Sequence, residues 1–292
     1  MLNKLNQSEV NSGIKIRALH SIEEMGQVRE LESKIWGFED SIPTHQTITA
    51  AKNGGLVLGA YFDDKIIGFQ YSFPGYDGQN VYLCSHMLGI DQEFRNKGIG
   101  KLLKNAQREE ALKLGYKLIT WTYDPLETAN GYLNISKLGG VCNTYIENCY
   151  GEMEDLLNSG IPSDRFLVEW YIAEVEEEKD NLRPFELDEA VKNSLIKWEE
   201  NNDGIPMPIQ NDIDVFNDLA FVAVPKDFRT IRETNSKIAS QWRMLTRESF
   251  KKLFQSGWKV TGFYKNSDSE MPVHFYVLKN KKENKGEFGN EN

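Results

Sequence analysis

The sequence contains few cysteines and histidines and no long apolar run. Its 292 residues include 3 cysteines without CxxC spacing and 4 histidines without HExxH spacing, so neither a disulfide framework nor a zinc site is indicated. No stretch approaches the roughly 18 apolar residues of a membrane-spanning helix, and the polar start MLNKLNQSEVNSG lacks the apolar core of a signal peptide. We therefore expect a cytoplasmic protein with no membrane partner and no metal.

Basic charge is also scarce. The chain carries 34 Lys and Arg against 44 Asp and Glu, a net charge of -10, whereas proteins that bind nucleic-acid backbones present a basic face. The 40% hydrophobic and 27% charged shares are ordinary for a globular protein. The chain is about twice as long as a typical domain of roughly 150 residues. We expect a folded protein of two lobes that does not bind nucleic acid.

Charge and proline divide the chain. The segment EVEEEKDNLRP at 174–184 is strongly acidic and ends in a proline, which predicts the boundary between the lobes. Residues 1–12 and the tail from about Asn280 lack apolar periodicity, so we expect both ends to be disordered. The predicted domains are a first lobe at 13–176 and a C-terminal lobe at 177–292, with a loop at 201–212 inside the latter.

Hydrophobic periodicity predicts an α/β fold with a mixed sheet. Ser21 and Glu24 have the spacing of a capping box at the start of a helix. The strands expected in the first lobe are 14–19, 56–62, 66–73, 81–90, 117–123, 142–147 and 166–173, and its helices are 21–36, 44–53, 98–115 and 126–138. The C-terminal lobe is expected to hold strands at 219–224, 258–264 and 274–279 and one helix at 230–257.

The helix expected at 98–115 is amphipathic. Its apolar stripe comprises Ile99, Leu102, Leu103 and Ala106. We assign its charged residues to a solvated face: Lys104, Arg108, Glu109, Glu110 and Lys113.

The segment FRNKGIGKLL at 94–103 joins a predicted strand to this helix and has the pattern Arg-x-x-Gly-x-Gly. Gly98 and Gly100 let the backbone approach a ligand closely, and the unpaired first amides of a helix favour an anion. A dinucleotide-binding loop would need a third glycine at Leu103, and a Walker A loop would need Ser or Thr at Leu102. The pattern therefore predicts a phosphate-binding loop of another kind.

This loop and the order of elements resemble those of the GNAT superfamily of acyl-CoA-dependent N-acyltransferases. In that fold the loop follows the fourth strand and cradles the pyrophosphate of coenzyme A, while a bulge and a splay expose fourth-strand amides to the pantetheine arm. The resemblance implies an acyl-CoA co-substrate. It places the pantetheine beside Met87, Leu88, Gly89 and Ile90, and the pyrophosphate beside Arg95, Asn96, Lys97, Gly98, Ile99, Gly100 and Lys101.

A closer resemblance, over about residues 14–279, is to a two-lobed bacterial branch of predicted GNAT acyltransferases. It rests on segments such as IWGFED (35–40), SHMLGI (85–90) and ITWTYDPLETANGYLNISKLGG (119–140). Some members of the branch resemble N-succinyltransferases of amino acids, which implies acetyl-CoA or succinyl-CoA as the donor. We expect the C-terminal lobe to be a degenerate GNAT-like half that covers the acceptor pocket or forms the face of a homodimer.

One position departs from the family pattern. Aligning the segment KLGG at 137–140 with the family's Lys-Leu-Gly-Phe ending places Ile135 where many GNAT enzymes have the tyrosine that protonates the leaving thiolate. Tyr132 and Asn134 are nearby substitutes, and a water molecule is the alternative.

Transfer to an amine also needs a group that removes a proton, because aliphatic amines are protonated at pH 7. His86, with an ordinary pKa near neutrality, is the first candidate, and a satisfied core histidine is the alternative. Glu169 lies among apolar neighbours, either as a buried base or as the solvent-side residue of a strand. Asp124 is a base at the end of a strand, or a turn and cap residue.

Two further side chains have two interpretations each. Arg165 would bind a carboxylate of the acyl group or of the acceptor, or would pair with the adjacent Asp164. Cys84 would be a thiol nucleophile with His86 as its partner, although a buried inert cysteine is favoured.

The sequence thus predicts an enzyme that moves an acetyl or succinyl group from CoA to the primary amine of a small molecule, with an amino acid favoured, by direct attack in a ternary complex. Fourth-strand amides would hold the carbonyl oxygen. The alternatives are a catalytically degenerate CoA-binding regulatory module, for which the missing tyrosine argues, and a binding protein that does not use CoA.

Overall fold

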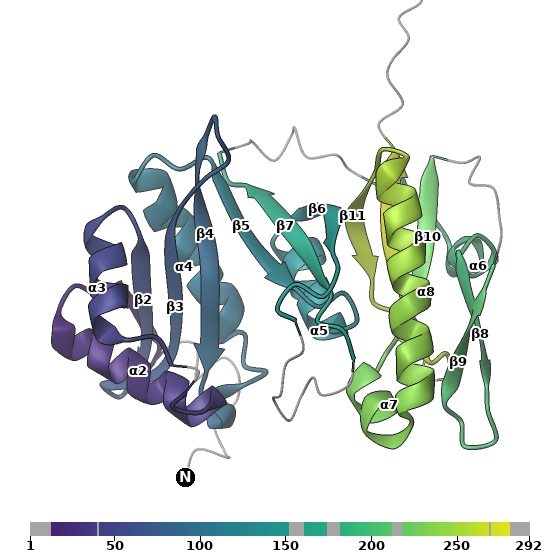
Figure 1. Cartoon of the computed structure of the whole chain (residues 1–292), viewed down its shortest axis with the longest axis horizontal. Coiled ribbons are helices and arrows are strands. Elements are labelled where there is room, and N and C mark those ends of the chain that lie inside the picture. The colour runs from purple at the N-terminus through teal and green to yellow at the C-terminus, as the bar shows by residue number, and fades with distance from the viewer. Residues whose placement is uncertain are drawn as a thin grey trace, which may run out of the picture. The chain divides into compact units, whose positions relative to one another are not determined.

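The structure is a computed structural model that describes residues 13–39, 41–151, 161–173, 182–211, 218–268 and 270–280 (Figure 1). The chain packs into two compact units: a first unit of Met1–Thr122 and Glu169–Lys179, and a second unit of Tyr123–Val168 and Asp180–Asn292. Most of the expected boundary segment, the expected disordered N-terminus at 1–12 and the tail beyond 280 lie outside the described residues. The predicted domain limits therefore stay predictions.

The first unit holds a sheet with helices on both faces. Its strands neighbour one another in chain order, antiparallel from β1 to β4 and parallel between β4 and β5. The strands are β1 (Lys15–Ala18), β2 (Leu56–Phe62), β3 (Lys65–Tyr76), β4 (Val81–Ile90) and β5 (Leu118–Tyr123). The helices are α2 (Ile22–Trp36), α3 (Thr44–Lys52), the 3-10 helix η2 (Gln92–Phe94) and α4 (Ile99–Lys113).

Strand β2 shows why this layering forms. Leu56, Leu58 and Ala60 pack into one core with α4, while Val57 and Tyr61 pack into a second core with α2. Successive side chains of a strand point to opposite faces, and here both faces are covered by helices. The run LVLGAYF is therefore apolar throughout instead of alternating.

The second unit holds a further run of paired strands and a separate hairpin. Its paired strands have the order β7-β6-β11-β12-β10, and the residues of β7 after Val168 belong to the first unit. The strands are β6 (Val141–Ile146), β7 (Arg165–Tyr171), β10 (Leu219–Pro225), β11 (Trp258–Tyr264) and β12 (Val273–Asn280), and the hairpin is β8 (Ile196–Glu200) with β9 (Pro206–Gln210). The helices are α5 (Thr128–Gly131), the π-helix η3 (Tyr132–Lys137), α6 (Leu187–Lys192), α7 (Phe228–Thr234) and α8 (Ser236–Gln255).

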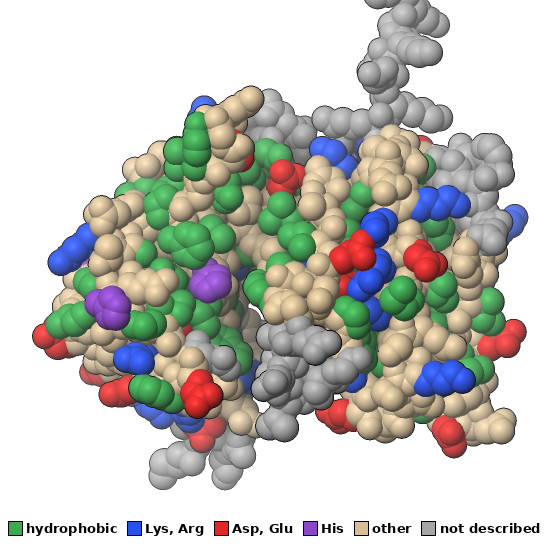
Figure 2. All heavy atoms as spheres, viewed as in Figure 1, with side chains coloured by type: hydrophobic (Ala, Val, Ile, Leu, Met, Phe, Trp, Pro, Cys, Tyr) green, Lys and Arg blue, Asp and Glu red, His purple; other side chains and the backbone are tan. Residues whose placement is uncertain are grey.

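Ion pairs run along α8. Glu147 pairs with Arg247 at 3.1 Å and with Lys251 one turn further on. Figure 2 shows acidic and basic side chains side by side over this helix. On the face in view, charges of both signs are therefore interspersed on α8.

The predicted fold class and element order are confirmed. From β1 to β7 the elements follow the expected order, with α5 and η3 together in the place of the helix expected at 126–138. Ser21 and Glu24 form the expected capping box. Of the helices that the structure describes, none has the length and apolar character that a membrane span requires. In the same residues, no three His, Cys, Asp or Glu side chains are grouped as metal ligands would be.

Two expectations for the second unit are wrong. The loop expected at 201–212 contains β9, where Pro206 and Pro208 pair with β8. These prolines are tolerated because β9 is an edge strand of a two-stranded sheet. The single helix expected at 230–257 is divided into α7 and α8 at Asn235, whose side chain accepts a hydrogen bond from the amide of Ile238 and caps α8.

Candidate functional site

Strand β4 carries a bulge at His86. Tyr71 of β3 pairs with Met87, and the next residue of β3, Ser72, pairs with Ser85, so His86 has no partner on β3. Bulges of this kind redirect a side chain and are common beside active sites. The exposed His86 side chain has its ring 6.1 Å from the ring of Tyr71 and 5.6 Å from that of Phe73. Partial burial lowers the pKa of His86 below its ordinary value, so the imidazole is neutral at pH 7.

Strands β4 and β5 form a fork. They pair only at Leu83 with Ile119 and at Cys84 with Thr120. Beyond these residues the two strands, both wholly within the described part of the chain, no longer pair. The amides of β4 that point away from β3 then have no strand to bond. The bulge and the splay that the resemblance implied are present.

The loop that leads into α4 exposes a run of backbone amides. Asn96 and Gly98 have left-handed backbone, with φ of 62° and 84°, and Gly98 caps α4. A residue with a Cβ costs roughly 1–2 kcal/mol in that conformation, which explains the glycine at 98. The amides from Asn96 to Gly100 form no hydrogen bond with another described residue, and the next amide, of Lys101, bonds the carbonyl of Gly98 at 3.1 Å. Unpaired amides at the positive end of a helix make a site for an anion.

Three cationic side chains accompany these amides. Arg95 and Lys101 are exposed, and Lys97 is half-buried with its Nζ 5.1 Å from the centroid of the Phe94 ring. Arg95 Nε donates to the carbonyl of Ile90 at 3.3 Å, which ties the loop to the end of β4. None of the three cations forms an ion pair with an acidic side chain of the described residues. The charge of the loop therefore suits phosphate.

Two of the residues expected beside CoA have structural roles. A Cβ on Gly89 would lie 2.4 Å from Cε1 of Phe69, so packing alone requires glycine there. Ile99 is 1% exposed and packs in the core under α4, which leaves only its backbone to face a ligand. Met87, Leu88 and Ile90 are half-buried on β4.

Glu169 lies on the same face of the first unit's sheet as His86. The ring of its neighbour Trp170 packs on Trp121, which contacts Lys104 of α4, so Glu169 points away from α4. Tyr71, which contacts His86, packs in the core on that same side. Oε2 of Glu169 is buried and has no hydrogen-bond partner in the described part of the chain. The structure thus brings two of the candidate bases to one face.

Asp124 lies in the second unit and is held by a guanidinium group. Both of its carboxylate oxygens bond Arg243, one of them at 2.8 Å, and the amide of Leu126 donates to Oδ1 at 2.9 Å. These contacts favour the turn and cap interpretation, and a role as base stays a prediction. Arg165 lies 3.9 Å from the Asp124 carboxylate and donates to the backbone carbonyl of Asp164 at 2.9 Å. The carboxylate of Asp164 instead bonds Tyr145 and Arg247.

The thiolate-protonation candidates lie on a π-helix of the second unit. The amide of Leu138 bonds the carbonyl of Leu133, five residues earlier, at 3.0 Å. This part of the helix expected at 126–138 is therefore π-helical, and π-helical turns are frequent at functional sites. Tyr132 is half-buried, with Nζ of Lys137 at 4.9 Å from its ring centroid, and Asn134 is buried. Ile135, which stands in the place of the family's tyrosine, is 3% exposed.

Lys104 was missed as a candidate, and its assignment to a solvated face is wrong. Its side chain is 4% exposed, and its Nζ donates to Ser85 Oγ at 2.7 Å and lies 3.6 Å from the centroid of the Trp121 ring. Burial lowers the pKa of Lys104 to about 7. The buried stripe of α4 includes Lys104, Gln107 and Ala111, whose helical spacing was the available signal.

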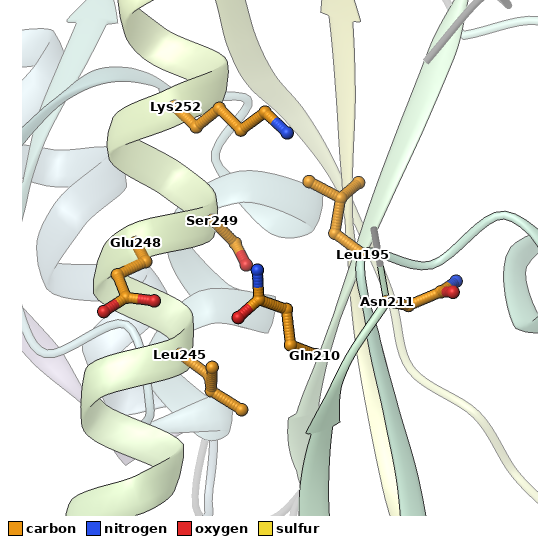
Figure 3. A pocket seen from close by; sticks show the side chains of 7 residues that line it. All are labelled: Leu195, Gln210, Asn211, Leu245, Glu248, Ser249 and Lys252. Atoms are coloured by element: carbon orange, nitrogen blue, oxygen red, sulfur yellow. The ribbon is translucent and has the colours of Figure 1, made fainter. Parts of the chain in front are cut away.

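A small pocket in the second unit does not suit a coenzyme. It lies between α8 and the end of β9, where Gln210, Glu248 and Lys252 line it (Figure 3). Its volume is about 60 Å³. Sites for small molecules usually measure roughly 300–1,000 Å³.

Comparison with known proteins gives one family. Residues 25–133 match the acetyltransferase (GNAT) family. Similar solved structures include the ribosomal-protein-S18-alanine N-acetyltransferase from Escherichia coli, with 15% identity, a TM-score of 0.45, and coverage of 59% of this chain and 99% of that one. A putative acetyltransferase from Salmonella typhimurium with acetyl-CoA has 15% identity, a TM-score of 0.45, and coverage of 58% and 99%. A GNAT acetyltransferase from Elizabethkingia anophelis with acetyl-CoA bound has 20% identity, a TM-score of 0.42, and coverage of 55% and 98%. The search of curated proteins found no match.

Proposed function

We propose that this chain, whose residues 25–133 match the acetyltransferase (GNAT) family, moves an acetyl or succinyl group from CoA to the primary amine of a small molecule, an amino acid first of all. The observation that carries the proposal is the fork between β4 and β5, followed along the chain by the run of unpaired amides from Asn96 to Gly100.

The first unit has the groups that acyl-CoA requires. The amides from Asn96 to Gly100, with Arg95 and Lys101, suit the pyrophosphate, and the unpaired amides of β4 along Met87–Ile90 suit the pantetheine arm. Acyl-CoA supplies an activated thioester carbonyl. An amide of β4 that donates to the carbonyl oxygen would stabilise the negative charge that develops there, and one such donor contributes roughly 3 kcal/mol.

We assign proton removal from the amine to His86. Its ring is exposed at the bulge, and its lowered pKa keeps it able to accept a proton at pH 7. Glu169, with its unpartnered Oε2 on the same face, is the second candidate. Attack by the amine is direct, because burial raises the pKa of Cys84 and so disfavours a thiolate nucleophile. Three further assignments stay predictions. They are the acid that protonates the thiolate (Tyr132, Asn134 or water), the contact of Arg165 with an anion, and a homodimer.

The proposal is tested by thiol release from acetyl-CoA and succinyl-CoA across a panel of amino acids and other primary amines. We expect His86→Gln to lower kcat by a factor of about 10² or more, the usual contribution of a general base. The rate of the unaltered enzyme should fall as the pH drops through a pKa below about 6.5. Glu169→Gln is the matched comparison on the same face. Full activity in His86→Gln, with the acid limb unchanged, would contradict the assignment.

A second candidate function is a CoA-binding regulatory module without turnover. The buried Ile135 in the place of the family's tyrosine favours it. Measurable binding of CoA together with no thiol release across the amine panel would establish this alternative.

A further inference from the structure

Lys104 is a buried cation without an anionic partner. Among the described residues its hydrogen-bond partner is the Ser85 hydroxyl, and its Nζ lies over the ring of Trp121. No Asp or Glu of the described residues forms an ion pair with it. Burying an ammonium group without a carboxylate is unfavourable, which is why burial lowers the pKa of Lys104, and an anion beside it would stabilise the charged form.

Lys104 lies where the fork opens. Cys84 and Thr120 form the last pair between β4 and β5. Ser85 and Trp121, the two residues that Lys104 contacts, directly follow them. The ammonium group of α4 is therefore at the point where the two strands separate. The proposed function brings the thioester end of acyl-CoA to that fork.

Two glutamines of this region carry buried polar atoms without hydrogen-bond partners among the described residues. Gln107 follows Lys104 by one turn on the buried stripe of α4, and both atoms of its side-chain amide are buried without a hydrogen bond. Gln70 donates to Ser85 Oγ at 3.3 Å, and its own Oε1 is buried without a partner. A cation and an unsatisfied N–H donor are the groups that bind a carboxylate.

We propose that Lys104, assisted by the side-chain amide of Gln107, binds a carboxylate at the far end of the acyl group, so that the donor is the CoA thioester of a short dicarboxylic acid. The inference rests on the proposed function. A carboxylate completes the ion pair that Lys104 lacks, and an uncharged acyl chain of the same length leaves it incomplete. Lys104 then determines which acyl group is accepted.

The test compares acyl groups that differ in charge at equal length. Kd values are measured by calorimetry for CoA, acetyl-CoA, butyryl-CoA and succinyl-CoA with the unaltered protein, Lys104→Met and Lys113→Met. Lys113 is the control, because it lies on the same helix, is exposed and pairs with Glu110. We expect succinyl-CoA to bind about tenfold or more tightly than butyryl-CoA. This preference should disappear in Lys104→Met and remain in Lys113→Met, with the affinity for CoA unchanged in both.

Each other outcome overturns the inference and identifies what failed. Binding of CoA with equal affinities for succinyl-CoA and butyryl-CoA removes the carboxylate site and leaves the proposed function intact. A preference that persists in Lys104→Met assigns the carboxylate to another residue. No binding of any of the four ligands contradicts both proposals. Lys104→Gln, which keeps a polar side chain, replaces Lys104→Met in these comparisons if the latter fails to fold.

Discussion

At the scale of the residue, Lys104 makes stability depend on pH. Its pKa of about 7 in the folded protein lies below the value of roughly 10.4 in an unfolded chain. The unfolded state therefore binds the proton more tightly, and the free energy of unfolding rises with pH between these values and is flat below them. We predict that the free energy of unfolding of the unaltered protein rises by about 2 kcal/mol more than that of Lys104→Met between pH 7 and pH 9. Urea titration of both proteins at each pH provides the measurement. Equal slopes for the two proteins would show that burial does not lower the pKa of Lys104.

The buried ion pair between Asp124 and Arg243 should contribute to the stability of the protein. Both side chains are buried, so Arg243→Met removes both charged hydrogen bonds of the Asp124 carboxylate and leaves it only Arg165, 3.9 Å away, as a cation. We expect a loss of about 3 kcal/mol in the free energy of unfolding, partly recovered by adding Asp124→Asn. Arg229→Met, which breaks the exposed pair with Glu127, serves as the control and should cost less than about 1 kcal/mol. Similar losses in the two arginine variants would contradict the structural role of the buried pair.

At the scale of the element, sequence and structure agree where a local pattern determines the element. The expected limits of 56–62, 81–90 and 258–264 coincide with β2, β4 and β11, because apolar runs there end at turn residues or glycine. Sequence and structure disagree where strand pairing or an unusual hydrogen-bond spacing, and not the local apolar pattern, determines the element. The prolines of β9 are compatible with an edge strand, and η3 follows a five-residue hydrogen-bond spacing that apolar periodicity does not reveal.

The division between α7 and α8 gives a prediction at this scale. Asn235 Oδ1 accepts a hydrogen bond from the amide of Ile238 at 3.1 Å and begins α8. Asn235→Ala should lower the free energy of unfolding by about 1 kcal/mol, while Asn235→Ser should retain most of it, because serine also caps helices. Urea unfolding of the three proteins provides the measurement. Equal stability of the alanine variant would mean that the cap does not hold α8.

At the scale of the whole molecule, the sequence did not predict the contacts between residues that lie far apart along the chain. The glycine loop lies within a few residues and was recognisable from them and from the family resemblance. Arg243 and Asp124 are 119 positions apart, and Lys104 meets Ser85 and Trp121 from different elements. Such contacts depend on tertiary packing, which local periodicity does not encode. The sequence therefore predicted the glycine loop of the candidate site but did not predict the burial of Lys104.

We propose that the loop before α4 binds the pyrophosphate of CoA, and the effect of CoA on the stability of matched glycine variants tests this site. Gly100 is in the first turn of α4, and Gly26 lies within α2, where nothing would be within 4 Å of an added Cβ. We predict that CoA at about 100 times its Kd stabilises the unaltered protein and Gly26→Trp by about 2.7 kcal/mol, seen as a rise in Tm. Gly100→Trp should remain folded without that rise. An equal rise of Tm in Gly100→Trp, or no rise in the unaltered protein, would show that this loop does not bind CoA.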